Sequence, residues 1–235
     1  MGDLAFGAGM GEVIGNLLPL AVGVAISPIP IIAVILMLLS PRARTTGPGF
    51  LAGWAGGIVI ATTVLVVIAN AIGMNSASGR PKTPVSWIEL LLGVLVLTLA
   101  VRQWTSRPGE GAEAETPSWM KAIDEVTPAR AATLGLLLSA VNPKNLIMCV
   151  AAGIAIAQGE MGVGGEVVAV AVFAVIAACS VAVPVLVYVF DADRMRGPLD
   201  ALKVWLERNS TTVMFVLLLV IGFVLLGKGI GGLID

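Results

Sequence analysis

Long runs of apolar residues dominate the chain, and six of them are long enough to cross a lipid bilayer as helices. A transmembrane helix needs about 20 predominantly apolar residues. The six runs cover residues 13–40, 50–74, 86–104, 128–158, 163–190 and 210–234. The pattern therefore predicts an all-α membrane protein with six transmembrane helices.

The composition agrees with this fold class. Apolar residues make up 57% of the chain and charged residues only 12%, whereas soluble domains carry about 25% charged residues. The chain has no His, the commonest metal ligand, and its net charge of −1 gives no basic excess for binding nucleic acid. Cys149 and Cys179 match no metal-binding or redox spacing. We therefore expect a protein that is not an enzyme and has no metal, cofactor or nucleic-acid partner.

Two longer polar segments, 105–127 and 191–209, separate the runs, and each is predicted to contain a short helix on the membrane surface. In the first segment, Trp119, Ile123 and Val126 have the spacing of one helical face. The second mixes basic residues with apolar ones. Amphipathic helices of this kind lie in the membrane interface. The alternative for both segments is a solvated linker.

Basic residues are divided unevenly between the two sides of the predicted membrane. With the N-terminus outside, ten Lys and Arg residues fall on the inner side and three on the outer side. Because basic residues accumulate in cytoplasmic loops, the chain is expected in the plasma (inner) membrane with both termini outside. No Lys or Arg precedes Val13, so we expect the first span to be retained rather than cleaved as a signal peptide.

The first and fourth spans carry the same helix-breaking pattern in their middle. Residues 27–30 read Ser-Pro-Ile-Pro, and residues 142–145 read Asn-Pro-Lys-Asn. Proline interrupts a helix, and Ser or Asn before it is a favourable N-terminal cap. We predict that each of these spans is broken, with a new half-helix beginning at Pro28 and at Pro143.

The positions of the two breaks indicate an internal repeat. Pro28 and Pro143 are 115 residues apart, about half the chain. Each half then has three spans, an odd number, so the second half crosses the membrane in the inverted direction. We predict a first three-helix repeat in residues 1–104, a cytoplasmic loop in 105–127 and a second, inverted repeat in 128–235. Paired breaks in an inverted 3+3 repeat are typical of a transporter binding site.

Lys144 gives this predicted site its charge. A cation at the centre of a bilayer costs at least about 2.5–3.5 kcal/mol on insertion scales, and the neighbouring spans offer no acidic partner at mid-depth. We expect Lys144 and the positive ends of two half-helices to line a hydrated cavity that binds an anionic group of a substrate. The predicted substrate-binding residues are Ser27, Pro28, Pro30, Asn142, Pro143, Lys144 and Asn145. The alternative is that the prolines are simple kinks and that Lys144 snorkels or pairs with Glu89.

Other polar and small residues within the spans are predicted to join helices rather than to bind a ligand. The polar ones are Thr62, Thr63, Asn70 and Ser180, and the small ones are Gly53, Gly56 and Gly57.

The broken first and fourth helices with an Asn-Pro-Lys turn resemble the lysine-exporter superfamily of small six-span exporters. One branch is more similar, the glycopeptidolipid- and sulfolipid-addressing proteins. The residues that carry this resemblance are Trp119, Ile123, Pro128, Gly135, Asn142, Pro143, Lys144, Asn145, Trp205, Asn209, Gly222 and Gly229. The resemblance implies a plasma-membrane exporter of lipid-linked or amphipathic molecules. Carried over by position, its functional core is Ser27, Pro28, Pro30, Asn142, Pro143 and Lys144.

Two functions remain open from the sequence. The first is an exporter or flippase that moves an anionic or amphipathic lipid or glycolipid by alternating access at the two breaks. The alternative is a non-transporting accessory scaffold of a lipid synthesis and export complex. The expected partners are a membrane lipid or lipid-linked substrate and a partner pump or synthase. The small size of the chain and its small-residue faces favour a homodimer.

Overall fold

The computed structural model describes residues 2–74, 83–106 and 126–234, and every regular element in these ranges is an α-helix. The helices described in residues 2–106 are α1 (Gly2–Ala25), α2 (Pro28–Leu39), α3 (Ala43–Ala71) and α4 (Thr83–Thr105). The helix predicted around Trp119 lies outside the described residues.

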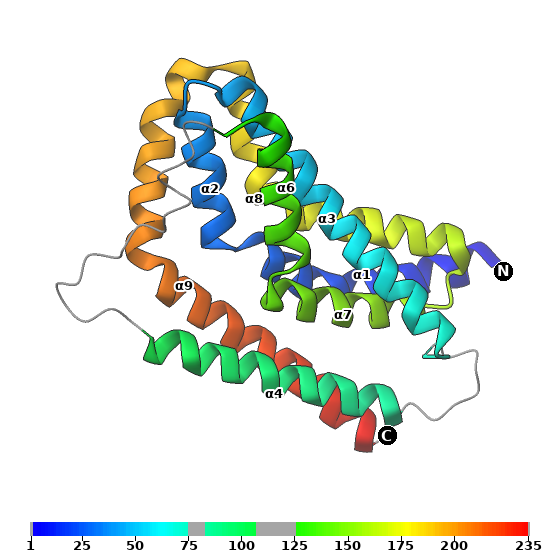
Figure 1. Ribbon diagram of the computed structural model, residues 1–235. Coiled ribbons are helices and arrows are strands. Elements are labelled where there is room, and N and C mark those ends of the chain that lie inside the picture. The colour runs from blue at the N-terminus through cyan, green and yellow to red at the C-terminus, as the bar shows by residue number, and fades with distance from the viewer. Residues whose placement is uncertain (1, 75–82, 107–125, 235) are drawn as a thin grey trace.

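In the second half, the helices described in residues 126–234 are α6 (Pro128–Ala140), α7 (Pro143–Gln158), α8 (Gly162–Phe190) and α9 (Ala192–Ile234). Each half therefore begins with two helices that meet at a short break, followed by two helices that are each long enough to span a membrane. Figure 1 shows that α1 and α7 lie side by side, and that α2 and α6 both lead away from them toward the opposite end of the molecule.

The helices account for the predicted membrane spans. Four of them, α3, α4, α8 and α9, are individually long and apolar enough to cross a membrane. The pairs α1–α2 and α6–α7 pass the same test together but are bent by 55° and 63° at their breaks. The chain is thus a multi-pass membrane protein with up to six spans, and the broken first and fourth helices are confirmed.

The path of the chain through the molecule agrees with an even number of crossings. The first turns of α1 and the last turns of α9 lie toward the same side in Figure 1, together with the end of α3 and the junction of α7 and α8. The junction of α2 and α3 and that of α8 and α9 lie on the other side.

Glycine brings α3 and α6 into close contact. A Cβ atom at Gly53 would overlap the backbone of Ala132, and one at Gly57 would overlap the hydroxyl of Ser139. Small residues in membrane helices allow this close approach of two backbones. The packing role predicted for Gly53 and Gly57 is confirmed, whereas Gly56 has nothing within 4 Å of its Cβ position. Gly56 points away from α6 because it lies outside the four-residue spacing that joins the other two.

The pair α4 and α9 is packed by the same device at the other edge of the molecule (Figure 1). Gly93 of α4 lies against Leu226, and Gly229 of α9 lies against Leu90. Glu89 and Lys228 interact electrostatically across this pair. The alternative that Lys144 pairs with Glu89 is not what the structure shows, because Nζ of Lys144 donates to Gly23, Ile26 and Ser27.

The long helix α9 corrects one prediction. Segment 191–209 is indeed helical, but it does not form a separate surface helix, because α9 continues without a break into the sixth span. No Gly or Pro lies between Leu199 and Ile221 to interrupt the backbone hydrogen bonds. The helix nevertheless changes direction along its length, as Figure 1 shows.

Candidate functional site

The candidate site is the place where the two helix breaks meet. At the first break, Pro28 and Pro30 lack the N–H groups that would bond to the carbonyl oxygens of Val24 and Ile26 in a continuous helix. The backbone N–H of Ser27 also leaves the helical pattern and donates to Ala25 at 2.9 Å. The last turn of α1 therefore ends with carbonyl groups that need other donors within the membrane.

The ammonium of Lys144, at the start of α7, supplies two of the required hydrogen bonds and a third one to a hydroxyl. Its Nζ donates to the carbonyl oxygen of Gly23 at 2.6 Å, to that of Ile26 at 3.2 Å and to Oγ of Ser27 at 2.5 Å. All three donors of the ammonium are thus used. The C-terminal end of α1 also carries partial negative charge, which stabilises the cation.

Two serine hydroxyls donate to the other two carbonyl groups of this turn, of which Ala25 also accepts from the backbone N–H of Ser27. Ser27 Oγ donates to Val24 at 2.8 Å, and Ser180 Oγ of α8 donates to Ala25 at 2.6 Å. Side chains from α7 and α8 therefore stabilise the end of α1. We call Ser27, Lys144 and Ser180 the polar cluster.

The second break is stabilised differently. Asn142 caps α7, with its Oδ1 accepting a hydrogen bond from the backbone N–H of Lys144 at 3.0 Å. Asn145 turns back, and its Nδ2 donates to the carbonyl oxygen of Leu138 at 3.2 Å. Asn145 is fully buried, and its Oδ1 has no hydrogen-bond partner among the described residues.

The structure brings most of the predicted site residues together, but not in the predicted way. Ser27, Pro28, Pro30, Lys144 and Asn145 are buried at the two breaks. The substrate-binding role of the seven predicted residues stays a prediction.

Two details of the expected geometry are wrong in this conformation. Lys144 is only 5% exposed and binds backbone carbonyls, so it does not line a hydrated cavity. Ser27 occupies the cap position of α2 without capping it, because its hydroxyl donates back to α1 and accepts from Lys144.

Ser180 belongs to the cluster, although the sequence predicted only that it joins two helices. That helix-joining role is confirmed by its bond to Ala25. Asn70, which donates to Glu166 of α8 at 2.8 Å, also joins two helices as predicted. The sequence signal for Ser180 is a single hydroxyl residue in an otherwise apolar stretch, four residues before Pro184.

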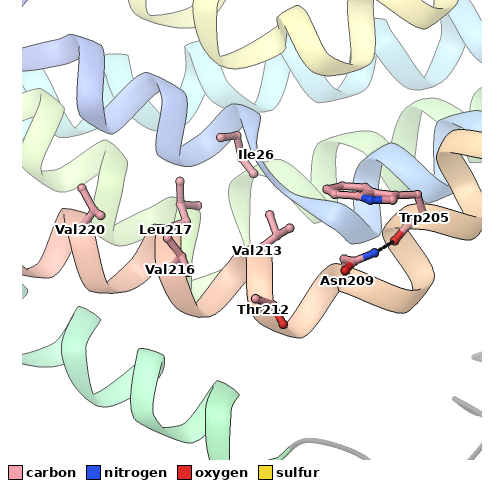
Figure 2. Close-up of a pocket in the computed structure, with 8 residues that line it drawn as sticks. All are labelled: Ile26, Trp205, Asn209, Thr212, Val213, Val216, Leu217 and Val220. Carbon is pink, nitrogen blue, oxygen red and sulfur yellow. Dashed lines mark hydrogen bonds between the residues drawn. The ribbon is translucent and has the colours of Figure 1, made fainter.

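An apolar groove lies directly beside the first break (Figure 2). It has a volume of about 430 Å³ and is lined by Ile26 and by seven residues of α9 between Trp205 and Val220. In Figure 2, the Ile26 side chain faces α9, while Trp205 and Asn209 lie at one end of the groove and Val220 at the other. Since the Ile26 carbonyl accepts from Lys144, this residue connects the groove to the polar cluster.

Among the described parts of the chain, no group of three or more His, Cys, Asp or Glu residues could hold a metal ion. What the fold and site define is a multi-pass helical membrane protein whose two broken spans are joined by buried hydrogen bonds.

The sequence matches a known protein family over most of its length. Residues 17–231 match the family described as Sap, sulfolipid-1-addressing protein (SfLAP), and the chain belongs to this family. The family resemblance seen in the sequence is therefore confirmed. No curated protein and no solved structure matches the chain.

Proposed function

We propose that the protein moves an amphipathic lipid with an anionic head group across the plasma membrane, by a rearrangement of its two broken helices. The family links the chain to lipid addressing. The observation that carries the proposal is the hydrogen bonding of Lys144 to the end of α1, because it makes the geometry of one break depend on the other.

The contacts of Lys144 suggest how a substrate could drive the change. A carboxylate, sulfate or phosphate is a stronger acceptor for an ammonium than a backbone carbonyl, because the hydrogen bond is then between two charges. An anionic head group that reaches Lys144 would replace Gly23 and Ile26 as its acceptors. The end of α1 would lose its donors, and the angle between α1 and α2 would be free to change. The substrate shifts the equilibrium because it binds only one of the two arrangements.

The packing of the two halves supports alternating access. Helix α1 packs on α8 and α6 packs on α3, so the first helix of each half contacts the long helix that follows the break in the other half. The last helices of the halves, α4 and α9, pack on each other. Two inverted repeats would produce this exchange of partners, and transporters of that kind bind their substrates between the repeats.

The proposal is tested by lipid movement in vesicles that contain the purified protein and a fluorescent phosphatidylglycerol. We expect Lys144→Met to slow the transfer of this lipid between leaflets at least about tenfold, the factor that about 1.4 kcal/mol in a barrier represents. Lys203→Met is the matched control, because Lys203 lies in a surface pair with Glu207 at 3.9 Å and should transfer lipid at the unchanged rate.

Equal transfer rates for the Lys144 and Lys203 variants, with normal folding of both, would contradict the proposal. If the unmodified protein moves no lipid but binds a lipid synthase, and loses that binding when residues 105–127 are deleted, the chain is the scaffold that the sequence left as the alternative.

A further inference from the structure

The groove beside the first break is polar at one end and apolar along the rest of its length. Trp205, Asn209 and Thr212 form the first part, whereas Val213, Val216 and the positions beyond them are aliphatic. These residues recur at intervals of three and four along α9, so they form one continuous stripe on the helix. The groove therefore has the polarity of an amphiphile laid along the helix.

A positive charge lies next to the polar end. Arg208 is exposed and is three residues from Trp205 and four from Thr212, so it neighbours both on the helix surface. Within the described ranges of the chain, no ion pair involves Arg208. An anionic group at this end of the groove would find a cationic partner that is not already engaged.

The size and lining of the groove fit a hydrocarbon chain. Its volume of about 430 Å³ lies within the range of about 300–1,000 Å³ that is usual for ligand sites. Water is a poor occupant of the aliphatic part, since a buried water needs two to four polar partners. Within the hydrocarbon layer of a membrane, lipid is the surrounding molecule that can cover the apolar side chains of the groove.

We propose that this groove binds one acyl chain of an anionic lipid, with the head group at the Trp205–Asn209 end beside Arg208. The inference rests on the proposed function, for which it gives the residues that hold the tail of the moving lipid. Ile26 links the groove to the helix break, because the acyl chain would contact the residue whose carbonyl accepts a hydrogen bond from Lys144. Lipid in the groove and the hydrogen bonding of the break are thereby coupled.

The test uses phosphatidylglycerol with a photoreactive diazirine on one acyl chain, in vesicles that contain the purified full-length protein. Cross-linked positions are mapped by mass spectrometry. We expect them to concentrate on residues 213–220 and on Ile26. Val216→Trp should lower the yield there at least about tenfold, because the indole occupies the volume of the chain. Val216 is 51% exposed, so the larger side chain does not disturb the core.

Val183→Trp is the matched control, since Val183 of α8 is 57% exposed and lies outside the groove. It should leave the cross-linking pattern unchanged. Val220→Trp is a second groove-filling variant, which should act as Val216→Trp does.

The head-group assignment has its own control. Arg208→Gln should reduce cross-linking by phosphatidylglycerol several-fold and leave that by photoreactive phosphatidylcholine unchanged, because only the former carries a net negative charge. Arg196→Gln, another exposed arginine of α9, should change neither.

Cross-links spread equally over Val183 and residues 213–220, or unaffected by both groove-filling variants, would overturn the inference. So would cross-links between two copies of the chain at residues 213–220, which would show that a second protomer covers the groove. Cross-linking as expected in a protein that transfers no lipid would leave the groove assignment standing and refute the proposed function instead.

Discussion

Lys144, Ser27 and Ser180 supply the last carbonyl groups of α1 with the hydrogen bonds that water would supply at a protein surface. Each unsatisfied backbone group in a lipid environment costs several kcal/mol, so a broken helix within a membrane must obtain donors from side chains. Four consecutive residues, Gly23 to Ile26, obtain them here. The cluster is therefore structural in this conformation, and its charge is held by a helix end rather than by an acid.

A single hydroxyl of this cluster can be removed without changing the charge. We expect Ser180→Ala to lower the free energy of unfolding by about 0.6 kcal/mol and by no more than about 1.7 kcal/mol, the average and the maximum found for hydrogen bonds between membrane helices. The measurement is denaturation of the purified protein in detergent. Thr98→Ala is the control, because Thr98 is exposed and its Oγ1 donates to Val94 within its own helix. Equal stability of the Ser180 variant and the unmodified protein would contradict this prediction and show that the backbone N–H of Ser27, which also donates to Ala25 at 2.9 Å, is sufficient.

The capping residue of the second break makes a separate prediction. Asn142→Ala removes the side-chain oxygen that accepts from the N–H of Lys144, and loss of such a cap costs about 0.5–2 kcal/mol. Asn142→Asp keeps an acceptor oxygen and should recover most of the loss. The same denaturation measurement distinguishes the variants, and an alanine variant as stable as the unmodified protein would contradict the capping role.

What the sequence could show at this scale was limited by the kind of group involved. Proline and lysine in apolar runs identify Pro28, Pro143 and Lys144 directly, because each is costly inside a membrane helix. The acceptors of Lys144 are mainly backbone carbonyls, which every residue has. No pattern of side chains distinguishes Gly23 or Ile26 as its partners, so their role emerges only when α1 and α7 are placed together.

At the scale of the element, α3 and α6 approach so closely that the positions of individual glycines matter. Gly135 of α6 lies against the backbone of Phe50 and Trp54, just as Gly53 of α3 lies against Ala132. This contact fixes the second span against the first part of the fourth, and thus fixes the position from which α7 starts. The placement of Lys144 depends on it.

Two neighbouring glycines of α3 test this packing. Gly53→Ala introduces a methyl group into the backbone of Ala132 and should destabilise the protein by about 1–3 kcal/mol, as overpacking usually does. Gly56→Ala places the same methyl group where nothing lies within 4 Å, and should be neutral or slightly stabilising because Ala favours the helix. Thermal unfolding in detergent measures both. Equal stabilities of the two variants would show that the contact of Gly53 with α6 does not determine the effect.

The elements themselves were largely predictable, because apolar length and proline are strong signals in a membrane chain. The continuity of α9 was not. The polar residues Asn209 to Thr212 look like a boundary in the sequence, but in the structure Asn209 donates to the carbonyl oxygen of Trp205 within the helix. A polar side chain that bonds to its own helix adds no break, and only a proline or glycine there would have provided one.

At the scale of the whole molecule, the distribution of basic residues predicts which face of the helix bundle is cytoplasmic. Arg44 lies in the first turn of α3, Arg194 in the first turn of α9 and Gly164 in the first turn of α8. The junctions α2–α3 and α8–α9 lie on one side of the molecule and the junction α7–α8 on the other (Figure 1). The predicted inverted arrangement follows from the odd number of spans per half. Its geometry depends on contacts between distant helices, which no local pattern in the sequence specifies.

The orientation is tested with single cysteines in a chain whose Cys149 and Cys179 are replaced by alanine. In intact cells, we expect a membrane-impermeant thiol reagent to label Gly164→Cys and not Arg44→Cys or Arg194→Cys, all three of which are exposed positions. Labelling of all three after permeabilisation is the control. The reverse pattern would place both termini in the cytoplasm and contradict the distribution of basic residues as the determinant of orientation.

The separation of the polar cluster along the chain has a consequence for biosynthesis. Lys144 and Ser180 follow their acceptors Gly23 and Ala25 by 121 and 155 residues. When the first span leaves the ribosome, neither donor has yet been translated, so the carbonyl groups of Gly23 and Ile26 lack the donor that Lys144 provides in the complete fold. The bend between α1 and α2 is thus completed by residues that are translated much later, and an amino-terminal fragment without Lys144 and Ser180 lacks these donors.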